Sequence, residues 1–236
     1  MKLLAVDTAT DACSAAVLVG DSVIERYALA PRDHARRILP MIDELLAEAG
    51  LSLRGLDALA FGRGPGAFTG VRIAAGVVQG LALGTDLPVI AVSDLAAIAH
   101  GAMRRQGWPA VLAAMDARMG EVYWGAFRRG PDGAAEAAGA EAAIAPRDVT
   151  APPGDWYGAG SAWAVYASEL RAALGLDFEF EGDCLPQAAD VARLAARDFG
   201  RGVALSAEEA LPIYLRDRVT WSRSSATSGS APPDMA

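Results

Sequence analysis

Two aspartates close apolar runs of similar composition, one at the start of the chain and one near its middle. Asp7 ends the run KLLAVD, and Asp116 ends the run VLAAMD. In an ATPase or kinase, carboxylates placed in this way hold Mg²⁺ or act as the catalytic base. Thr8 and Thr10 follow Asp7, and hydroxyls beside a carboxylate can hold phosphate or metal-bound water. The same residue types also form turns by bonding to their own backbone, and the sequence leaves both interpretations open.

A glycine-rich loop is the second candidate for chemistry. Between Gly62 and Gly70 the chain has four glycines and one proline, and an apolar helical pattern follows. A loop that opens into a helix leaves backbone N–H groups pointing at one place, which suits an anion such as phosphate. The loop lacks the Gly-Lys-Ser/Thr of a P-loop and the GxGxxG with an acidic partner of a dinucleotide site. A tight structural turn, in which glycines allow positive φ and close approach, is the alternative.

Histidine and cysteine usage argues against a metal site or a disulfide framework. The two histidines, His34 and His100, each lack a second histidine three to five residues away, so we expect no His-based zinc or iron site. Two cysteines, Cys13 and Cys184, are too few for a disulfide framework and favour a reducing cytoplasm.

Composition narrows the class of protein further. The net charge of −8 argues against a chain that binds nucleic acid on its own, because Lys and Arg contacts to phosphate supply most of that affinity. No apolar run reaches the ~20 residues of a membrane span, and none is flanked like a signal peptide. We therefore expect a cytoplasmic globular protein with no membrane contact.

The elements that position the first set of candidate residues can be predicted from hydrophobic periodicity and from Gly, Pro and cap signals. The first three strands form an antiparallel meander, and Asp33 is a plausible N-cap of the first helix. The expected order is strands 2–7, 12–20 and 23–27, helix 36–49, strand 57–62, helix 70–84, strand 88–92 and helix 94–102.

Glycines mark one face of the helix expected over 70–84. Gly76, Gly80 and Gly84 recur every four residues and share that face. A glycine inside a helix costs about 1 kcal/mol relative to alanine, so the stripe needs a compensating close contact. That contact is either packing within the chain or a subunit interface.

Three arginines, Arg32, Arg36 and Arg37, surround the start of the first helix. They are either a solvated helix start or a contact surface for an acidic partner or RNA. The sequence does not decide between them.

The second half of the chain repeats the opening of the first. Each half begins with an apolar strand that ends in Asp, followed by a hairpin, which is typical of a duplicated fold with a cleft between its halves. Asp7 and Asp116 are expected to face each other across that cleft. The elements expected here are strands 111–116 and 122–127, an ambiguous third strand within 134–145, strand 156–161, helix 162–174, strand 176–180, helix 188–199 and an extended segment 210–215.

Domain organisation follows from this duplication. We expect a first lobe over 1–105 that carries a partner interface, and a smaller second lobe over 106–221 whose last segment could return to the first lobe. Residues 222–236 are Ser, Ala, Gly and Pro-rich, cannot bury a core, and are expected to be a disordered tail.

A three-strand meander followed by α-β-α-β-α, repeated with a cleft Asp in each half, resembles the actin-like ATPase fold, an α/β fold that is ribonuclease H-like in each lobe. Five strings of residues narrow the resemblance to the TsaB family, also called YeaZ, and the likeness extends to Trp221. The strings are LAVDTAT, HARRILPMIDELL, GPGAFTGVRIAAGVVQGLA, MDARMGEVYWGAF and PIYLRDRVTW.

The resemblance implies a non-catalytic dimerisation subunit with no catalytic residue, no cofactor and no metal. Such a subunit pairs with the catalytic subunit TsaD, or with itself, through its first two long helices. With TsaD and the ATPase TsaE it makes threonylcarbamoyladenosine next to the anticodon, and it meets tRNA only through the complex. The interface residues expected on this basis are Arg36, Leu39, Ile42, Leu46, Gly70, Ile73, Gly76, Val77 and Gly80, and a vestigial cleft would retain Asp7, Thr8, Thr10 and Asp116.

One departure from the catalytic sibling supports this interpretation. The resemblance implies that the sibling holds a metal with two histidines four residues apart on its first helix, whereas this chain has His34 followed by Ile38. Two enzyme alternatives remain open: an autonomous actin-like ATPase or small-molecule kinase that uses Asp7, Asp116 and the glycine-rich loop, and a metallopeptidase, which the missing histidine pair disfavours.

Overall fold

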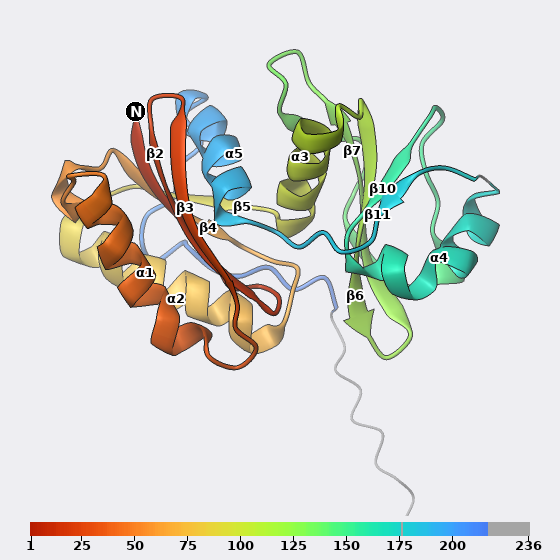
Figure 1. Ribbon diagram of the computed structural model, residues 1–236, viewed down its shortest axis with the longest axis horizontal. Helices are drawn as coiled ribbons and strands as arrows, with labels where there is room; N and C mark the ends of the chain where they lie inside the picture. Colours follow the sequence, from red (N-terminus) through yellow and green to blue (C-terminus); the bar gives the residue numbers. More distant parts are fainter. Residues whose placement is uncertain (176, 217–236) are drawn as a thin grey trace, which may run out of the picture.

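A computed structural model of the chain describes residues 1–175 and 177–216. Its described part is a mixed α/β structure with two separate sheets (Figure 1). The first sheet has the strand order β3-β2-β1-β4-β5, in which β1, β2 and β3 are antiparallel and β1, β4 and β5 are parallel. Its strands are β1 (Lys2–Asp7), β2 (Ala12–Val19), β3 (Ser22–Leu29), β4 (Ala58–Gly62) and β5 (Val89–Val92).

Alternate residues of β1 face two different helical layers. Leu4 and Val6 pack with α1 (His34–Glu48) and α2 (Phe68–Thr85), whereas Leu3 and Ala5 pack in a cluster with α3 (Asp94–Gln106) and α5 (Ala188–Gly200). This division follows from the two-residue period of a strand. Because both faces are covered, the strand is apolar throughout and ends in a buried Asp7.

The second sheet has the order β11-β10-β6-β7-β8, and β9 also pairs with β7. Its strands are β6 (Ala110–Arg118), β7 (Glu121–Arg129), β8 (Ala135–Ala137), β9 (Ala142–Ile144), β10 (Tyr157–Ala159) and β11 (Phe180–Glu181). Helix α4 (Ser161–Leu174) covers one face through Trp163, whose Nε1 donates to Leu112 O at 2.9 Å. Short 3₁₀ helices η1 (Leu53–Gly55) and η2 (Pro146–Asp148) complete the elements of the described residues.

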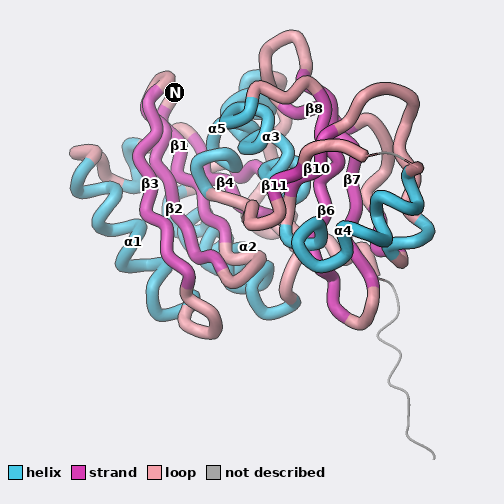
Figure 2. Tube along the Cα trace, turned by 45° about the vertical axis from the view of Figure 1, so that its right-hand side comes forward, coloured by secondary structure: helices cyan, strands magenta, loops and turns pink. Residues whose placement is uncertain are grey.

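Helices α3 and α5 lie between the two sheets (Figures 1 and 2). Both belong to one buried cluster that takes residues from β1 of the first sheet and β6 of the second. Asp190 on α5 accepts from Arg104 on α3 at 3.2 Å, which links the two helices. The core is therefore continuous from one sheet to the other.

The end of the described chain crosses back over the first sheet. Leu205 forms an isolated bridge with Val89, Ile213 N donates to Arg63 O at 2.7 Å, and Arg216 donates to Glu121 on the second sheet. Helix α5 also packs against β1, β2 and β4. The division at residue 105 stays a prediction, and the predicted tail over 222–236 lies outside the described residues.

Two predictions of secondary structure are wrong in detail. The ambiguous stretch 134–145 forms two short strands, β8 and β9, rather than one. The strand predicted over 176–180 is confined to Phe180–Glu181, with residue 176 outside the described part. The segment 210–215, which was predicted to be extended, contains no helix or strand. Asp33 does occupy the N-cap position of α1, but its carboxylate binds Arg37 at 2.8 Å and caps no backbone N–H.

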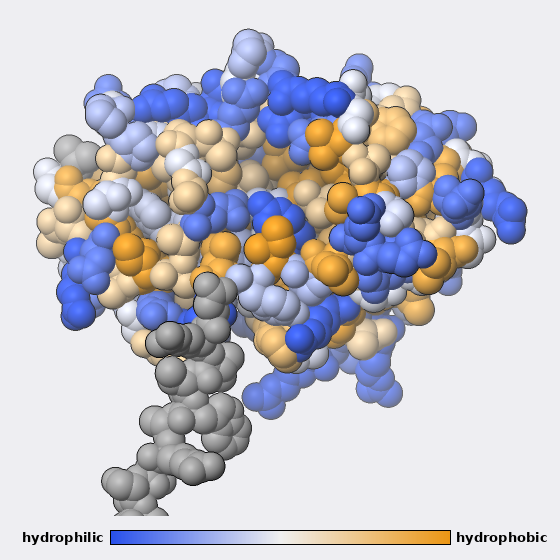
Figure 3. All heavy atoms as spheres, turned by 180° about the vertical axis from the view of Figure 1, so that it is seen from behind, coloured by the Kyte–Doolittle hydropathy of each residue, from blue (hydrophilic) through white to orange (hydrophobic). Residues whose placement is uncertain are grey.

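Among the described helices, α2 is the one long and apolar enough to cross a bilayer, judged by length and composition alone. Helices at the core of soluble proteins pass the same test. Val71, Ala74 and Val78 bury one face of α2 against the first sheet, and its first turns carry the exposed Arg72. On the face of the molecule in Figure 3, hydrophobic residues are interspersed with hydrophilic ones and form no continuous apolar band.

Candidate functional site

Two buried carboxyl groups meet at the edge of the first sheet where β1, β4 and β5 end. Asp7 ends β1 and Asp94 follows β5, and neither is exposed to solvent. Asp7 Oδ1 accepts from Ala9 N at 3.0 Å, and Asp94 Oδ2 accepts from Gly64 N. Gly62, at the end of β4, lies beneath them: a Cβ there would lie 2.4 Å from Asp7 Oδ2 and 2.5 Å from Asp94 Oδ1. Glycine is therefore required between the two carboxyl groups.

The remaining oxygens of this pair, Asp7 Oδ2 and Asp94 Oδ1, have no hydrogen-bond partner elsewhere in the described chain. Burial raises the pKa of Asp7, and burial together with the charge of Asp7 raises the pKa of Asp94 well above its usual range. Two adjacent carboxyl groups in a dry site cannot both ionise. Burial and the mutual repulsion of the two carboxylates therefore favour the protonated form of one member of the pair.

Protonation of this pair makes stability depend on pH, and Asp94→Asn should remove most of the dependence that arises from Asp94. Because both pKa values are raised on folding, the pair stabilises the native state at acidic pH and loses that contribution as pH rises through the folded-state values. Asparagine can accept from Gly64 N and donate to Asp7 Oδ2. We expect the variant to be about 1–3 kcal/mol more stable than wild type near pH 8 and nearly equal to it near pH 4.

Urea unfolding at several pH values measures this effect. Asp57→Asn, at an exposed carboxylate that accepts from Lys2 N at the other end of the sheet, is the control. Parallel pH profiles for Asp94→Asn and wild type would show that protonation of Asp94 does not make stability depend on pH.

The predicted encounter of Asp7 with Asp116 is wrong. Asp7 is sealed beneath the edge of the sheet against Asp94, because β5 ends beside β4 in the same parallel ladder. The Asp116 carboxylate instead accepts from Arg118, at 2.8 Å from its backbone N and 3.1 Å from its side chain. The two aspartates therefore belong to different environments.

A cavity of about 310 Å³ separates the ends of the two sheets. Thr10 and Asp116 line it from opposite sides, and Thr10 Oγ1 accepts from Ala12 N at 3.2 Å. Thr8 does not reach the cavity: it is buried and donates to Gly70 O at 2.7 Å. Of the four cleft candidates, the structure places Thr10 and Asp116 at the cavity, and Asp7 and Thr8 within the protein interior.

The glycine-rich loop uses its backbone within the chain. Arg63 N donates to Val92 O at 2.8 Å, Gly64 N donates to Asp94, and Ala67 N donates to Ala9 O at 2.7 Å. Gly64 has a φ of +101°, and a Cβ on it would lie 2.7 Å from Ile213 O. These contacts support the tight-turn interpretation of the loop over phosphate binding.

The residues expected at a partner interface divide into two groups. Arg36, Leu39, Gly76 and Gly80 are exposed, and Ile73 and Val77 are half-buried. Ile42, Leu46 and Gly70 are buried inside the chain and belong to its own packing. A Cβ on Gly76, Gly80 or Gly84 would meet nothing within 4 Å, so no element of the described chain packs on the glycine stripe.

The remaining metal-ligand candidate is used internally. His34 is buried, and its Nε2 lies 2.8 Å from Thr10 O. Among the described residues no three His, Cys, Asp or Glu side chains gather in a way that could hold a metal ion.

Asp94 is the site residue that sequence reasoning missed. The sequence pattern predicts Asp94 only as the first residue of the helix 94–102. It does begin α3, and Ser93 caps that helix through its Oγ, which accepts from Ala96 N. The available signal was positional: Asp94 follows a predicted parallel strand, so its side chain comes to the same edge as Asp7.

Comparisons with known proteins agree with one another. A family model described as "TsaD: tRNA N6-adenosine threonylcarbamoyltransferase" matches residues 23–215. The chain is 43% identical to the Escherichia coli K12 "tRNA threonylcarbamoyladenosine biosynthesis protein TsaB", covering 94% of this chain and 98% of that protein. The Haemophilus influenzae protein of the same name is 42% identical, with 94% and 97% covered.

Solved structures give the same relationship. The structure described as "YeaZ from Pseudomonas aeruginosa" has a TM-score of 0.86 and 48% identity to this chain, and the match covers 91% of this chain and 99% of that one. Similarity of this extent includes both sheets and the helices between them.

Proposed function

Because this chain belongs to the TsaB (YeaZ) family of tRNA threonylcarbamoyladenosine biosynthesis proteins, we propose that it is the non-catalytic dimerisation subunit of the complex that makes this modification. Its partners would be the threonylcarbamoyltransferase subunit TsaD and the ATPase TsaE, with tRNA reached through the assembled complex. The site of action would be the cytoplasm.

The observation that carries this proposal is the uncovered face of α2. Gly76, Gly80 and Gly84 expose helix backbone there, and the exposed Leu39 lies on the neighbouring helix α1. A bare glycine face lets a second helix approach closely, which would offset the helix propensity lost at each glycine. The partner is TsaD in the complex, or a second copy of this chain when TsaD is absent.

We further assign the chain to the duplicated actin-like fold. In the first sheet the meander β1-β2-β3 and the parallel strands β4 and β5 give the order β3-β2-β1-β4-β5. In the second sheet the order is β8-β7-β6-β10-β11, again a meander followed by two parallel strands. The equivalent order of the two sheets supports a duplication, with the cavity between the halves as its cleft.

The condition of that cleft supports a non-catalytic role. Asp7 is buried against Asp94, and Asp116 is engaged by Arg118 at 3.1 Å. Neither carboxylate is free to orient a metal ion on a phosphate group in this arrangement.

The proposal is tested by threonine incorporation into unmodified tRNA. The reaction contains TsaD, TsaE and the donor-forming enzyme, with or without this chain. We expect incorporation to require both this chain and TsaD, with no activity when TsaD is omitted. Equal activity without this chain would refute the proposal.

The cavity of about 310 Å³ between the halves favours one alternative, an autonomous actin-like ATPase or small-molecule kinase. Asp116→Asn separates the two functions when tRNA modification by the reconstituted set and ATP hydrolysis by the purified chain are both measured. A non-catalytic subunit should keep tRNA modification within about twofold of wild type, whereas an ATPase should lose its hydrolysis of ATP by orders of magnitude. ATP hydrolysis by the purified wild-type chain is the matched measurement.

A further inference from the structure

Two aromatic rings and one guanidinium group form an exposed stack at the start of α2. The Phe68 and Tyr214 ring centroids lie 5.5 Å apart, and Arg72 Cζ lies 3.4 Å from the Phe68 centroid and 5.3 Å from that of Tyr214. Phe68 is 59% exposed and Tyr214 is 42% exposed. Exposed rings held in a fixed arrangement by an arginine offer a flat surface to a further planar group.

Exposed arginines lie at the starts of both helices. Arg32 precedes α1 and Arg72 lies in the first turns of α2, and neither forms an ion pair with another described residue. The first turns of α1 and α2 meet at the β1–β2 turn, because the His34 ring binds Thr10 O and Ala67 N binds Ala9 O. Neither helix has an acidic residue in its first turn or a side-chain cap, so the positive ends of both helix dipoles add to the arginines.

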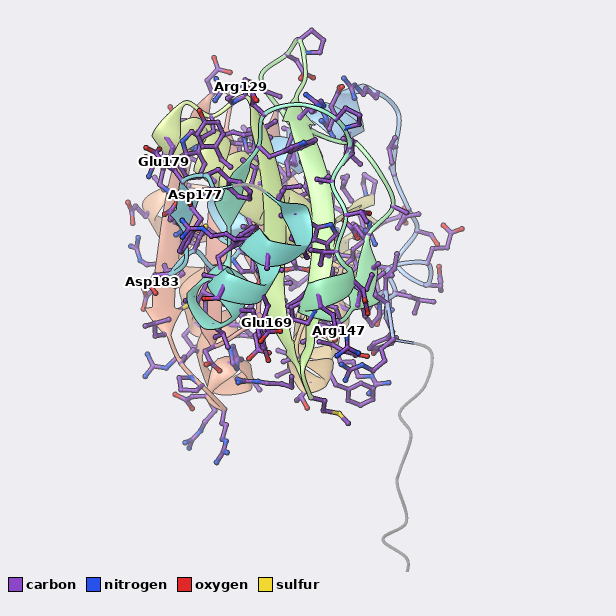
Figure 4. The ribbon with its side chains drawn as sticks, turned by 90° about the vertical axis from the view of Figure 1, so that its right-hand side faces the viewer. Arg129, Arg147, Glu169, Asp177, Glu179 and Asp183 are labelled. Atoms are coloured by element: carbon purple, nitrogen blue, oxygen red, sulfur yellow. The ribbon has the colours of Figure 1, made fainter. Side chains whose placement is uncertain are left out.

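Nearby acids compensate this charge only in part. The Asp33 carboxylate is paired with Arg37 at 2.8 Å, and Asp11 is exposed in the β1–β2 turn. Other exposed acidic residues lie on the outward side of the second sheet and α4, where Figure 4 labels Glu169, Asp177, Glu179 and Asp183. The net charge of −8 therefore hides a local surplus of arginine where α1 and α2 begin.

We propose that this surface, the α1–α2 edge (Arg32, Phe68, Arg72 and Tyr214), binds a single-stranded segment of RNA. One unpaired base stacks on the Phe68–Tyr214 rings, and the adjoining phosphates contact the arginines. An acidic peptide would satisfy the arginines but leave the ring faces uncovered, whereas RNA supplies both a flat base and a phosphate at fixed spacing.

The inference rests on the proposed function, because the RNA at hand would be the tRNA held by the complex. A surface with two unpaired arginines is expected to bind RNA weakly by itself, which agrees with an acidic chain that meets tRNA in an assembly. Within the complex the contact becomes intramolecular, and its effective concentration is high.

The test is fluorescence anisotropy of a labelled anticodon stem-loop RNA with the complex of this chain and TsaD, measured over a range of salt concentrations. Phe68→Ala should weaken binding about tenfold, as loss of one base–aromatic stack does. Arg72→Gln should reduce the slope of log affinity against log salt by about 0.7, as loss of one phosphate contact to a single strand does. Arg54→Gln, an equal charge change in η1 before β4, should change neither quantity.

A second set of variants guards against loss of fold. Phe68→Trp retains a stacking ring and should keep wild-type affinity, and Arg72→Lys should keep the salt slope while losing part of the stack. Wild-type affinity and salt slope in both Phe68→Ala and Arg72→Gln would overturn the inference.

Co-elution of every variant with TsaD is recorded in parallel, which separates the two proposals. If the variants co-elute with TsaD and bind RNA as the wild-type chain does, RNA binding at the α1–α2 edge is refuted. The proposed function is unaffected by that outcome. If the wild-type chain fails to co-elute, the same RNA measurements on the full chain alone at low salt test the edge independently.

Discussion

A Gly80→Leu variant is expected to lose its association with TsaD while folding like the wild-type chain. Gly80 lies in the middle of α2, is exposed, and a Cβ on it would meet nothing within 4 Å. The monomer therefore has room for the leucine. A helix packed on the glycine stripe has no such room, because glycine there allows the two backbones to approach more closely than any side chain would permit. We expect affinity for TsaD to fall by at least about a hundredfold, which corresponds to about 2.7 kcal/mol.

Co-elution and calorimetric titration with purified TsaD measure this loss, and thermal unfolding of the isolated variant confirms its fold. Gly200→Leu is the matched control, since Gly200 ends α5 and also meets nothing within 4 Å. Gly80→Ala adds helix propensity of about 1 kcal/mol and should weaken association less than leucine does. Undiminished binding by Gly80→Leu would place the interface on another surface.

The first sheet could be predicted from the sequence because its signals are local. The strand predicted at 2–7 is confirmed with the same bounds, and the meander is bounded by turn residues such as Gly20 and Asp21. The helices were predicted two residues short at their starts: α1 begins at His34 rather than Arg36, and α2 at Phe68 rather than Gly70. Asp33 marks the N-cap position of α1 in the sequence, but neither start has a side-chain cap hydrogen bond.

The outer strands of the second sheet, β8 to β11, were harder to predict because each is only two or three residues long and carries a weak pattern. Residues 134–145 are mostly alanine, glutamate and glycine, so strand propensity is low, and pairing of β8 and β9 with β7 decides their structure. The strand order of each sheet depends on such long-range pairing. The position of Asp94 directly after a predicted strand was a signal for its encounter with Asp7, but the order β1-β4-β5 that brings the two residues together comes from long-range pairing.

The faces of α1 and α2 show a second limit of sequence reasoning. The apolar stripe of α1 is wide enough to serve both a core and a partner, and nothing in the pattern separates Ile42, which is buried, from Leu39, which is 48% exposed. The glycines of α2 have the same ambiguity. Both Gly70 and Gly80 are helix glycines and cannot be told apart by residue type. Gly70 lies against the β1–β2 turn, whereas Gly80 faces solvent.

Gly70→Ala should therefore act on folding and not on a partner surface. A Cβ at Gly70 would lie 2.1 Å from Thr8 O, which is backbone and cannot turn aside, and the Thr8 hydroxyl donates to Gly70 O at 2.7 Å. The variant must separate the start of α2 from the end of β1, or lose that bond. We expect it to lower the free energy of unfolding by about 3 kcal/mol, because steric conflict within a buried backbone contact is among the most destabilising changes.

Gly76→Ala, two turns along the same helix, is the matched control for this prediction. Its Cβ meets open space, and the added helix propensity should raise the free energy of unfolding by up to about 1 kcal/mol. Urea unfolding of the two variants beside wild type gives both values. A lower free energy of unfolding for Gly70→Ala and a higher one for Gly76→Ala would show that the fold requires glycine at position 70 but not at position 76. Equal, small effects would mean that the start of α2 can move away from the β1–β2 turn at little cost, and that Gly70 has no special role in the fold.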